Sequence, residues 1–387
     1  MWDRMGILRR ILDAVRGLVM LRTAIRVCVS RELPPTNVRM VLFAAVTALG
    51  FMAAHVVAEE QTMPPIPQQP TDRSKVLQSL PQPELELLRD AVAYQISMGR
   101  SLETSCEQIK KSGELASIAA EQSQETFVAA MYEVLTKAPE PPARRPRALA
   151  LIGDRYHHPT YIRPPLEKAC GKANLPVTFI YDVRLLNEQL LEQYDLLIIL
   201  RDGMLWPTPL PNDPYGKDRV FWLSQPQEMA IAAFVTRGGG YLALHNATAL
   251  KGLNDEDSLY LQVLGASYAG HGKEREGYQV RVTDTEHPVV QGVQDYFVTD
   301  ERHWPKLYAT DAQVFLEAMA TDRRSIHGFT RTCGEGRVCY LANGHNREVL
   351  ESQPVQQMLV SAMKWCLTPR IEKLNQGVLV GSEASRE

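Results

Sequence analysis

The stretch RGGGYLALHNATA, residues 237–249, places a histidine where many α/β enzymes carry their nucleophile. Three glycines end a helix-like run, four mostly apolar residues predict a buried strand, and His245 follows at the end of that strand. A nucleophile elbow would have a serine or a cysteine at this point. An imidazole is a poor nucleophile, but near neutral pH it carries protons or binds a metal ion. The stretch therefore indicates proton-transfer or metal chemistry at His245.

Several other histidines follow predicted strands in the same way. Of the nine histidines in the chain, four or five fall at predicted strand ends or in the loops beyond them. His157 and His158 follow RALALIG, His271 lies in SYAGHGKE, and His345 ends YLANGH. Ligand crevices of open α/β sheets lie at the carboxyl ends of the strands. We therefore expect at least three of His158, His245, His271 and His345 to converge on one pocket, and only one of the adjacent His157 and His158 to point inward.

Glu301, in the segment VTDERHW, supplies a carboxylate to such a pocket. With Glu301, His245 could form a catalytic acid–base pair. With His158, His271 and His345, it could instead hold a divalent metal such as zinc, whose catalytic sites use about three protein ligands and a water molecule. Imidazole-rich sites suit zinc, copper, iron or nickel better than magnesium. The sequence contains no H-x-x-x-H or H-E-x-x-H spacing, so a metal site has to be assembled from distant segments.

Short apolar runs that alternate with helical patterns position these residues. The runs are RALALIG, PVTFIYD, YDLLIIL and GGYLALH, and helix candidates such as RLLNEQLLEQ and QEMAIAAFVTRGG separate them. Nearly continuous apolar strands that alternate with helices predict an α/β fold, with a parallel sheet covered by helices on both faces. A small helical region precedes this fold, because apolar residues recur near the 3.6-residue period between about residues 82 and 138.

Length and composition limit the functions to consider. At 387 residues the chain can hold about two domains, and its 45% hydrophobic and 22% charged residues are ordinary globular values. The formal net charge of -3 gives no electrostatic argument for binding nucleic acid. The six cysteines include no C-x-x-C pair, which argues against a zinc knuckle.

Proline-rich linkers and an apolar segment divide the chain. We expect an N-terminal extension with a signal peptide or anchor, a first linker, the helical region, a second linker, the α/β domain and a C-terminal tail. Their predicted ranges are 1–58, 59–81, 82–138, 139–146, 147–368 and 369–387. The helical region carries no cluster of catalytic residue types, so packing or partner contact is its expected role.

The apolar run VLFAAVTALGFMAAHVVA, residues 41–58, predicts export. It contains no formal charge, and it ends in VVA before Glu59 and Glu60, which resembles a small-residue cleavage site. We interpret it as a signal peptide cut after Ala58, although its 18 residues also suffice for a membrane anchor. Either interpretation makes the mature chain periplasmic, secreted or anchored to a membrane through this segment.

Five motifs resemble those of the ThuA-like (trehalose-utilisation) family. They are HHPTY, GGGYLALHNAT, GASYAGH, DTEHPVVQGVQDYFVTDE and GEGRVCYLANGH, and they follow the family's order between about Arg147 and Leu367. The resemblance implies a flavodoxin-like sheet related to the class I glutamine amidotransferases, and it aligns His158 with the histidine of the family's early motif. Amidotransferase activity is excluded, because its thioester chemistry needs a cysteine at the position of His245.

The family name implies an exported enzyme that acts on a small-molecule sugar or sugar derivative. We expect His245 and Glu301 to transfer protons in it, with or without a divalent metal such as zinc and without a nucleotide cofactor. The residues that we expect to contact the sugar are Tyr156, Asn246, Asp300 and Trp304. We expect no nucleic-acid partner, and membrane contact only through the N-terminal segment.

Three departures from the family pattern favour a substrate that differs from that of better-known members. Arg302 and His303 stand where the family often has an aromatic residue after its DE. Asn246 replaces the common alanine or serine, and Asn343 adds a polar residue to the last motif. The alternative is a non-catalytic module that binds a carbohydrate or a partner on the same fold. A pocket with fewer than three of the named side chains would favour that alternative.

Overall fold

The computed structural model describes residues 73–116, 118, 121–209, 219–251, 258–320 and 323–383. From Thr71 onward the chain forms one compact unit. The predicted signal peptide or anchor and residues 59–72 of the first linker lie outside the described residues, so both remain predictions. Among the described residues, no helix combines the length and the apolar character that a membrane span requires.

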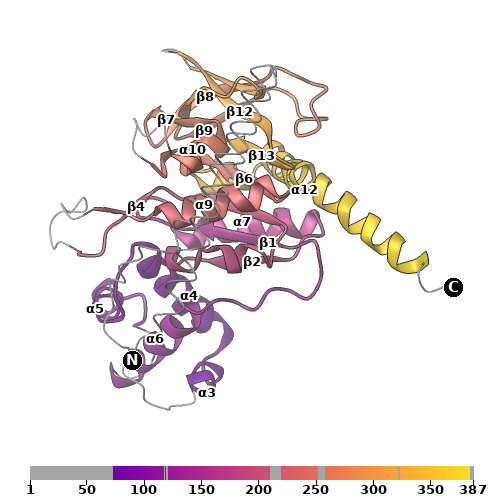
Figure 1. Ribbon diagram of the computed structural model, residues 1–387. Helices are drawn as coiled ribbons and strands as arrows, with labels where there is room; N and C mark the ends of the chain where they lie inside the picture. Colours follow the sequence, from indigo (N-terminus) through magenta and orange to yellow (C-terminus); the bar gives the residue numbers. More distant parts are fainter. Residues whose placement is uncertain are drawn as a thin grey trace, which may run out of the picture. The chain divides into compact units, whose positions relative to one another are not determined.

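A mixed nine-stranded sheet with the order β2-β1-β3-β6-β13-β12-β11-β8-β9 forms the centre of this unit (Figure 1). The parallel half consists of β2 (Val177–Ile180), β1 (Ala148–Ile152), β3 (Leu196–Leu200), β6 (Gly240–Leu244) and β13 (Gly336–Leu341). The antiparallel half consists of β12 (Arg324–Cys333), β11 (Gln313–Met319), β8 (Glu276–Val282) and β9 (Tyr296–Asp300). Two small antiparallel pairs are separate from this sheet: β4 (Met204–Leu205) with β5 (Val220–Phe221), and β7 (Ala266–His271) with β10 (His303–Leu307).

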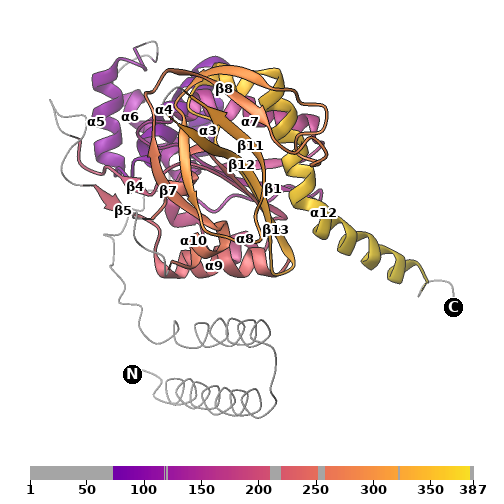
Figure 2. The ribbon, with the colours of Figure 1, turned by 90° about the horizontal axis from the view of Figure 1, so that it is seen from above.

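Helices cover both faces of the sheet, as the sequence predicted (Figure 2). On one face lie α7 (Pro159–Lys172) and α12 (Gln353–Glu383). On the other face lie α8 (Glu188–Leu191), α9 (Gln225–Thr236) and α10 (Leu259–Leu264). The predicted α/β, flavodoxin-like fold is thereby confirmed, and the antiparallel half is an extension that the sequence did not predict.

Strand β1 shows why the parallel strands are apolar without interruption. All of its residues are buried, and successive side chains enter opposite cores. Leu149 and Leu151 pack with the α8 and α9 side, whereas Ala148, Ala150 and Ile152 pack with the α7 and α12 side. A strand buried on both faces has no position for a polar side chain.

The described helices that precede the sheet are α3 (Arg73–Gln78), α4 (Gln82–Ser97), α5 (Leu102–Ser112) and α6 (Glu121–Leu135). The Ser101 side chain accepts a hydrogen bond from the Thr104 amide and caps α5. Leu88, Val92 and Ile96 of α4 are buried in the same core as β1 and α7. The helical region therefore packs directly on the α/β fold.

The predicted C-terminal tail, residues 369–387, begins inside helix α12, which continues to Glu383. Arg370 donates from Nε to the Asp195 carboxylate at 3.0 Å. Asp195 directly precedes β3 and is buried. This ion pair therefore fastens the middle of α12 to the amino end of the sheet.

Gly240, the third glycine of RGGG, lies where β6 passes the backbone of α12. A Cβ atom there would meet the Cys366 carbonyl oxygen at 2.8 Å, whereas at Gly171, near the end of α7, it would meet no described atom within 4 Å. We expect Gly240→Ala to lower the free energy of unfolding by about 1–3 kcal/mol. We expect Gly171→Ala to raise it by up to about 1 kcal/mol. Urea unfolding measures both, and wild-type stability of Gly240→Ala would contradict this close packing.

Candidate metal centre

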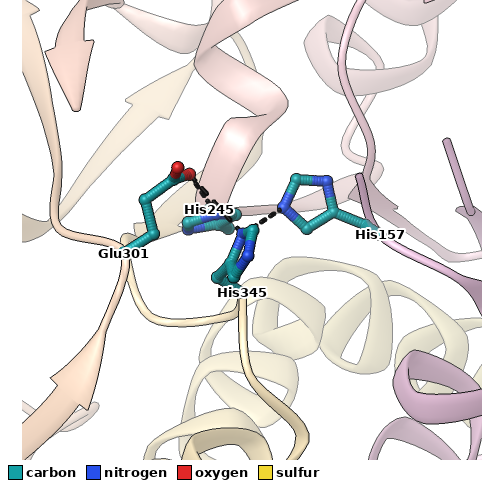
Figure 3. A group of neighbouring side chains, drawn as sticks. All are labelled: His157, His245, Glu301 and His345. Atoms are coloured by element: carbon teal, nitrogen blue, oxygen red, sulfur yellow. Dashed lines mark hydrogen bonds and ion pairs between the residues drawn. The ribbon is translucent and has the colours of Figure 1, made fainter. Parts of the chain in front are cut away.

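Four side chains that can bind a metal ion meet at the carboxyl edge of the sheet (Figure 3). His157 follows β1, His245 follows β6, His345 follows β13, and Glu301 follows β9. Strand β9 runs in the same direction as β13, because four antiparallel pairings separate the two strands. The ligand atoms of the four side chains all lie within 4.8 Å of one another.

His245 stands on a strained turn between β6 and the 3-10 helix η2 (His245–Ala249). Its φ of 48° lies in the left-handed region, which costs a non-glycine residue about 1–3 kcal/mol. Its Nδ1 atom lies 2.9 Å from the Ala342 carbonyl oxygen. Because a carbonyl oxygen only accepts, Nδ1 carries the proton. The Nε2 atom is buried and has no hydrogen-bond partner among the described residues, so its lone pair is available to a metal ion.

His157 is oriented by Asp154. The Nδ1 atom of His157 lies 2.8 and 3.1 Å from the two carboxylate oxygens, and its Nε2 lies 3.0 Å from Nδ1 of His345. The carboxylate also accepts hydrogen bonds from Asn246 Nδ2 at 2.8 Å and from the Asp202 amide at 2.9 Å. Burial raises the pKa of Asp154, but the charge of His157 and its hydrogen bond help to hold this pKa well below its usual range. Such a carboxylate commonly stands behind a histidine ligand of a metal.

Asp300 holds the loop that carries His345. Its buried carboxylate accepts hydrogen bonds from the Gly344 amide at 3.1 Å, the Asn346 amide at 3.0 Å and Asn346 Nδ2 at 2.9 Å. We expected Asp300 to contact the sugar, but it lies beneath this loop and positions His345 instead. Burial lowers the pKa of His345 to about 3, together with the charges of His157 and His245. The His345 ring is therefore neutral near pH 7.

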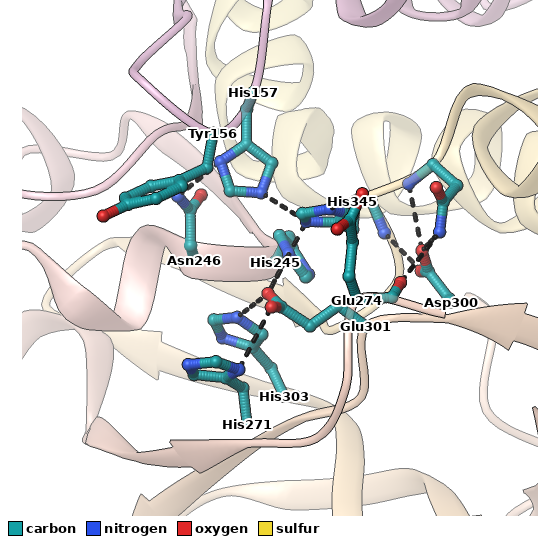
Figure 4. A network of polar contacts seen from close by, with 12 residues as sticks. Tyr156, His157, His245, Asn246, His271, Glu274, Asp300, Glu301, His303 and His345 are labelled. Atoms are coloured by element: carbon teal, nitrogen blue, oxygen red, sulfur yellow. Dashed lines mark hydrogen bonds and ion pairs between the residues drawn. The ribbon is translucent and has the colours of Figure 1, made fainter. Parts of the chain in front are cut away.

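Glu301 lies among histidines from several segments (Figure 4). Its Oε2 atom lies 2.9 Å from His303 Nε2, 3.4 Å from His245 Nε2 and 3.6 Å from His345 Nδ1. Its Oε1 atom lies 3.0 Å from His271 Nδ1. Burial raises the pKa of Glu301, but its close contacts with His245, His271 and His303 outweigh burial and hold the pKa well below its usual range. Glu301 is therefore an anion near pH 7.

Three of the six distances between the ligand atoms lie near the spacing around a metal ion. Ligand atoms at about 2.0–2.2 Å from a tetrahedral zinc ion lie roughly 3.3–3.6 Å from one another. The corresponding distances are 3.0 Å for His157 Nε2 to His345 Nδ1, 3.4 Å for His245 Nε2 to Glu301 Oε2, and 3.6 Å for His345 Nδ1 to Glu301 Oε2. Three imidazoles and a carboxylate suit zinc, iron or nickel. The group could therefore hold a metal ion.

His157, and not His158, belongs to this group, which corrects the assignment made from the sequence. His158 caps α7, since its Nδ1 accepts a hydrogen bond from the Thr160 amide at 3.2 Å, and its ring packs on Tyr94 with the centroids 4.0 Å apart. These contacts turn the two adjacent rings in different directions. His271 also lies outside the group of four, because its exposed side chain contacts the outer oxygen of Glu301.

The other residues that we expected at the sugar have different surroundings. The buried Oδ1 atom of Asn246 has no hydrogen-bond partner among the described residues. Tyr156 directly precedes His157, and its side chain is half-buried (Figure 4). Trp304 packs against the guanidinium groups of Arg302 and Arg323, which lie 4.8 and 4.5 Å from the centroid of its ring.

Besides His157, the network members Asp154 and His303 were not among our predicted site residues. His303 is buried with its ring centroid 4.0 Å from that of His245, and burial lowers its pKa well below the usual value. The sequence contains a signal for Asp154, which directly follows the first apolar run and stands three residues before His157 in GDRYHH. A signal for His303 is its place two residues after Glu301, since alternate residues of an extended segment share one face.

Asp154→Asn is expected to weaken metal binding by about 10- to 100-fold. An asparagine carries no charge and has one acceptor oxygen, so it cannot replace all the hydrogen bonds that orient His157. Zinc titration against a competing chelator measures the affinity, and circular dichroism monitors the fold. Asp311→Asn is the matched control, because Asp311 is exposed and pairs with Arg331. Wild-type affinity of Asp154→Asn would contradict an orienting role.

Comparison with known proteins assigns the α/β part of the chain to a family. The family model ThuA, described as trehalose utilisation, matches residues 147–366. No curated protein matches the chain. A solved structure of a putative ThuA-like protein from Bacteroides uniformis is 17% identical with a TM-score of 0.44, over 59% of this chain and 94% of that chain. Another, from Parabacteroides merdae, is 14% identical with a TM-score of 0.45, over 58% of this chain and 91% of that chain.

Proposed function

The chain belongs to the ThuA family, and on this premise we propose that it is an exported enzyme that acts on a sugar or sugar derivative. In this proposal His157, His245 and His345 hold a divalent metal ion such as zinc, and Glu301 transfers a proton. The proposal depends on one observation, the convergence of these four side chains within 4.8 Å at the carboxyl edge of the sheet.

Two of the three imidazoles are oriented so that the lone pair of Nε2 points to the group. His245 Nδ1 is hydrogen-bonded to the Ala342 carbonyl oxygen, and His157 Nδ1 is hydrogen-bonded to the Asp154 carboxylate. The Nε2 atom of each of these two rings therefore faces the group. This arrangement favours His245 as a ligand rather than as a proton carrier. Catalytic zinc sites use three protein ligands and keep one open position. A metal ion bound there would polarise a hydroxyl or carbonyl oxygen of the sugar.

Glu301 is the group best placed to move a proton. It is an anion, and its Oε2 atom lies 3.4 Å from His245 Nε2, within the proposed metal group. Its Oε1 atom contacts the exposed His271 at 3.0 Å. We propose that Glu301 accepts the proton from the substrate and that His271, whose Nδ1 faces both Glu301 and the Gly272 carbonyl oxygen, donates a hydrogen bond that stabilises the carboxylate.

The proposed substrate is a small-molecule sugar, with trehalose and its derivatives as first candidates because of the family's description. The half-buried Tyr156 and the unsatisfied Oδ1 atom of Asn246 are proposed to contact its hydroxyl groups. The proposal includes export through residues 41–58 to the periplasm or the medium, or anchoring to a membrane through them. It requires no nucleotide cofactor and no nucleic acid.

Conversion of sugars tests the proposal. The purified full chain is incubated in heavy water with trehalose, its derivatives and a panel of other sugars, with and without added zinc, and followed by proton NMR. We expect metal-dependent conversion of one sugar, or exchange of one of its carbon-bound protons for deuterium. Saturable binding without either change would support a non-catalytic binding module. The absence of both binding and conversion would contradict a carbohydrate function.

A further inference from the structure

The last turns of α4 pack on the loop that follows β1. The Tyr94 hydroxyl donates to the Arg155 carbonyl oxygen at 3.1 Å. Gly153 has a φ of 90°, and a Cβ atom at this position would lie 3.1 Å from the Ser97 Cβ atom. Only glycine allows the loop to adopt this conformation and approach the helix so closely. Asp154 is the next residue, so contacts with α4 lie on both sides of it.

Arg201 joins the same helix to the loop that follows β3. Its side chain is fully buried, and its Nη2 atom donates to the Ser97 carbonyl oxygen at 3.2 Å and the Met204 carbonyl oxygen at 3.4 Å. Its Nε atom donates to the Asp202 carbonyl oxygen at 3.1 Å. Because a buried charge is costly without such partners, these bonds fix the β3 loop against α4. The Asp202 amide in turn donates to Asp154.

Helix α4 is thereby connected to a metal ligand through a short series of contacts. Asp154 is held through Gly153 on one side and through Asp202 on the other, and it hydrogen-bonds to His157 at 2.8 Å. Partners that orient a ligand influence metal affinity strongly. Helix α4 lies before the residues that match the ThuA family model, 147–366, so this support comes from outside the family's domain.

We infer that α4 is a positioning element of the metal centre, and that Tyr94 and Arg201 set the orientation of the Asp154–His157 pair. The inference rests on the proposed function for the presence of a bound metal, whereas the hydrogen bonds around Asp154 are made by the chain itself. The helical region is accordingly part of the site, and its removal would disturb the first histidine ligand.

Titration of the full chain with Co2+, followed by its visible spectrum, tests the inference. Tyr94→Phe is expected to weaken Co2+ binding roughly fivefold, the equivalent of one hydrogen bond. Arg201→Lys is expected to weaken it by roughly tenfold or more. Tyr132→Phe is the matched control, because the Tyr132 hydroxyl donates to the Arg100 carbonyl oxygen at 2.9 Å within the helical region. We expect this control to bind Co2+ within about twofold of the wild type.

Hydrogen exchange gives a second readout that needs no metal. The amides of Tyr156, His157 and Asp202 donate to Asp154, and we expect Tyr94→Phe to accelerate their exchange. Unchanged exchange and unchanged affinity in Tyr94→Phe would overturn the inference, as would equal losses in Tyr132→Phe. If the wild type binds no Co2+, the proposed metal function fails and the exchange rates alone decide the inference. Tyr94→Phe removes a single hydrogen bond and keeps the test valid even if Arg201→Lys does not fold.

Discussion

His157→Ala is expected to lower the affinity for zinc by at least about 100-fold, whereas His158→Ala is expected to keep it. The two residues are neighbours, but only His157 directs a nitrogen to the group, with its Nε2 atom 3.0 Å from His345 Nδ1. His158 caps α7 and packs on Tyr94. Removal of one of three imidazoles leaves fewer protein ligands than catalytic zinc sites use.

Metal content measures this difference directly. The full chain and both variants are loaded with zinc and dialysed, and the metal-to-protein ratio is determined by mass spectrometry. The loss of a helix cap in His158→Ala costs about 1 kcal/mol of stability, so thermal unfolding is recorded for each variant. If His158→Ala loses its metal while His157→Ala retains it, the assignment of His157 to the metal group is wrong. A wild type without metal would contradict the metal function as a whole.

This pair of histidines shows where prediction from the sequence succeeds and where it fails. The sequence was enough to place His245 and His345 at the ends of parallel strands, because β6 and β13 are mostly apolar runs. It could not choose between His157 and His158, which follow the same strand. The choice depends on Asp154, which is held by Asn246 and Asp202, 92 and 48 residues away in the sequence. Such long-range contacts leave no local pattern.

The fold, too, could be predicted from the sequence only in part. The parallel half was predictable, because strands such as β3 are buried on both faces and consist of apolar residues only. Strand β8 was not predicted, since its buried Tyr278 and Val280 alternate with more exposed residues, and its place in the sheet depends on pairing with distant strands. The contact of α4 with the crevice loops was missed for a related reason. The apolar period of α4 predicts a buried face but not the loop against which its last turn lies.

Glu301→Gln is expected to lower kcat by about 10²–10⁴-fold while the metal stays bound. Glutamine has nearly the same shape but is neutral, so it cannot accept the proton that Glu301 is proposed to take from the sugar. The histidines His157, His245 and His345 remain, and they supply the three ligands of a catalytic zinc site. Turnover of the sugar that the wild type converts is measured beside the metal-to-protein ratio of the same sample.

Glu274→Gln separates the role of Glu301 from the general effect of a negative charge near the crevice. Glu274 is exposed, and its Oε1 atom lies 3.8 Å from His345 Nε2, on the outer side of the same ring. We expect Glu274→Gln to keep both metal and turnover, because its carboxylate faces solvent and not the other ligand nitrogens. If Glu301→Gln loses the metal together with its activity, Glu301 is a ligand and the proton has another acceptor. If it keeps both, the proton-transfer role is wrong and the three histidines with their metal suffice for the reaction.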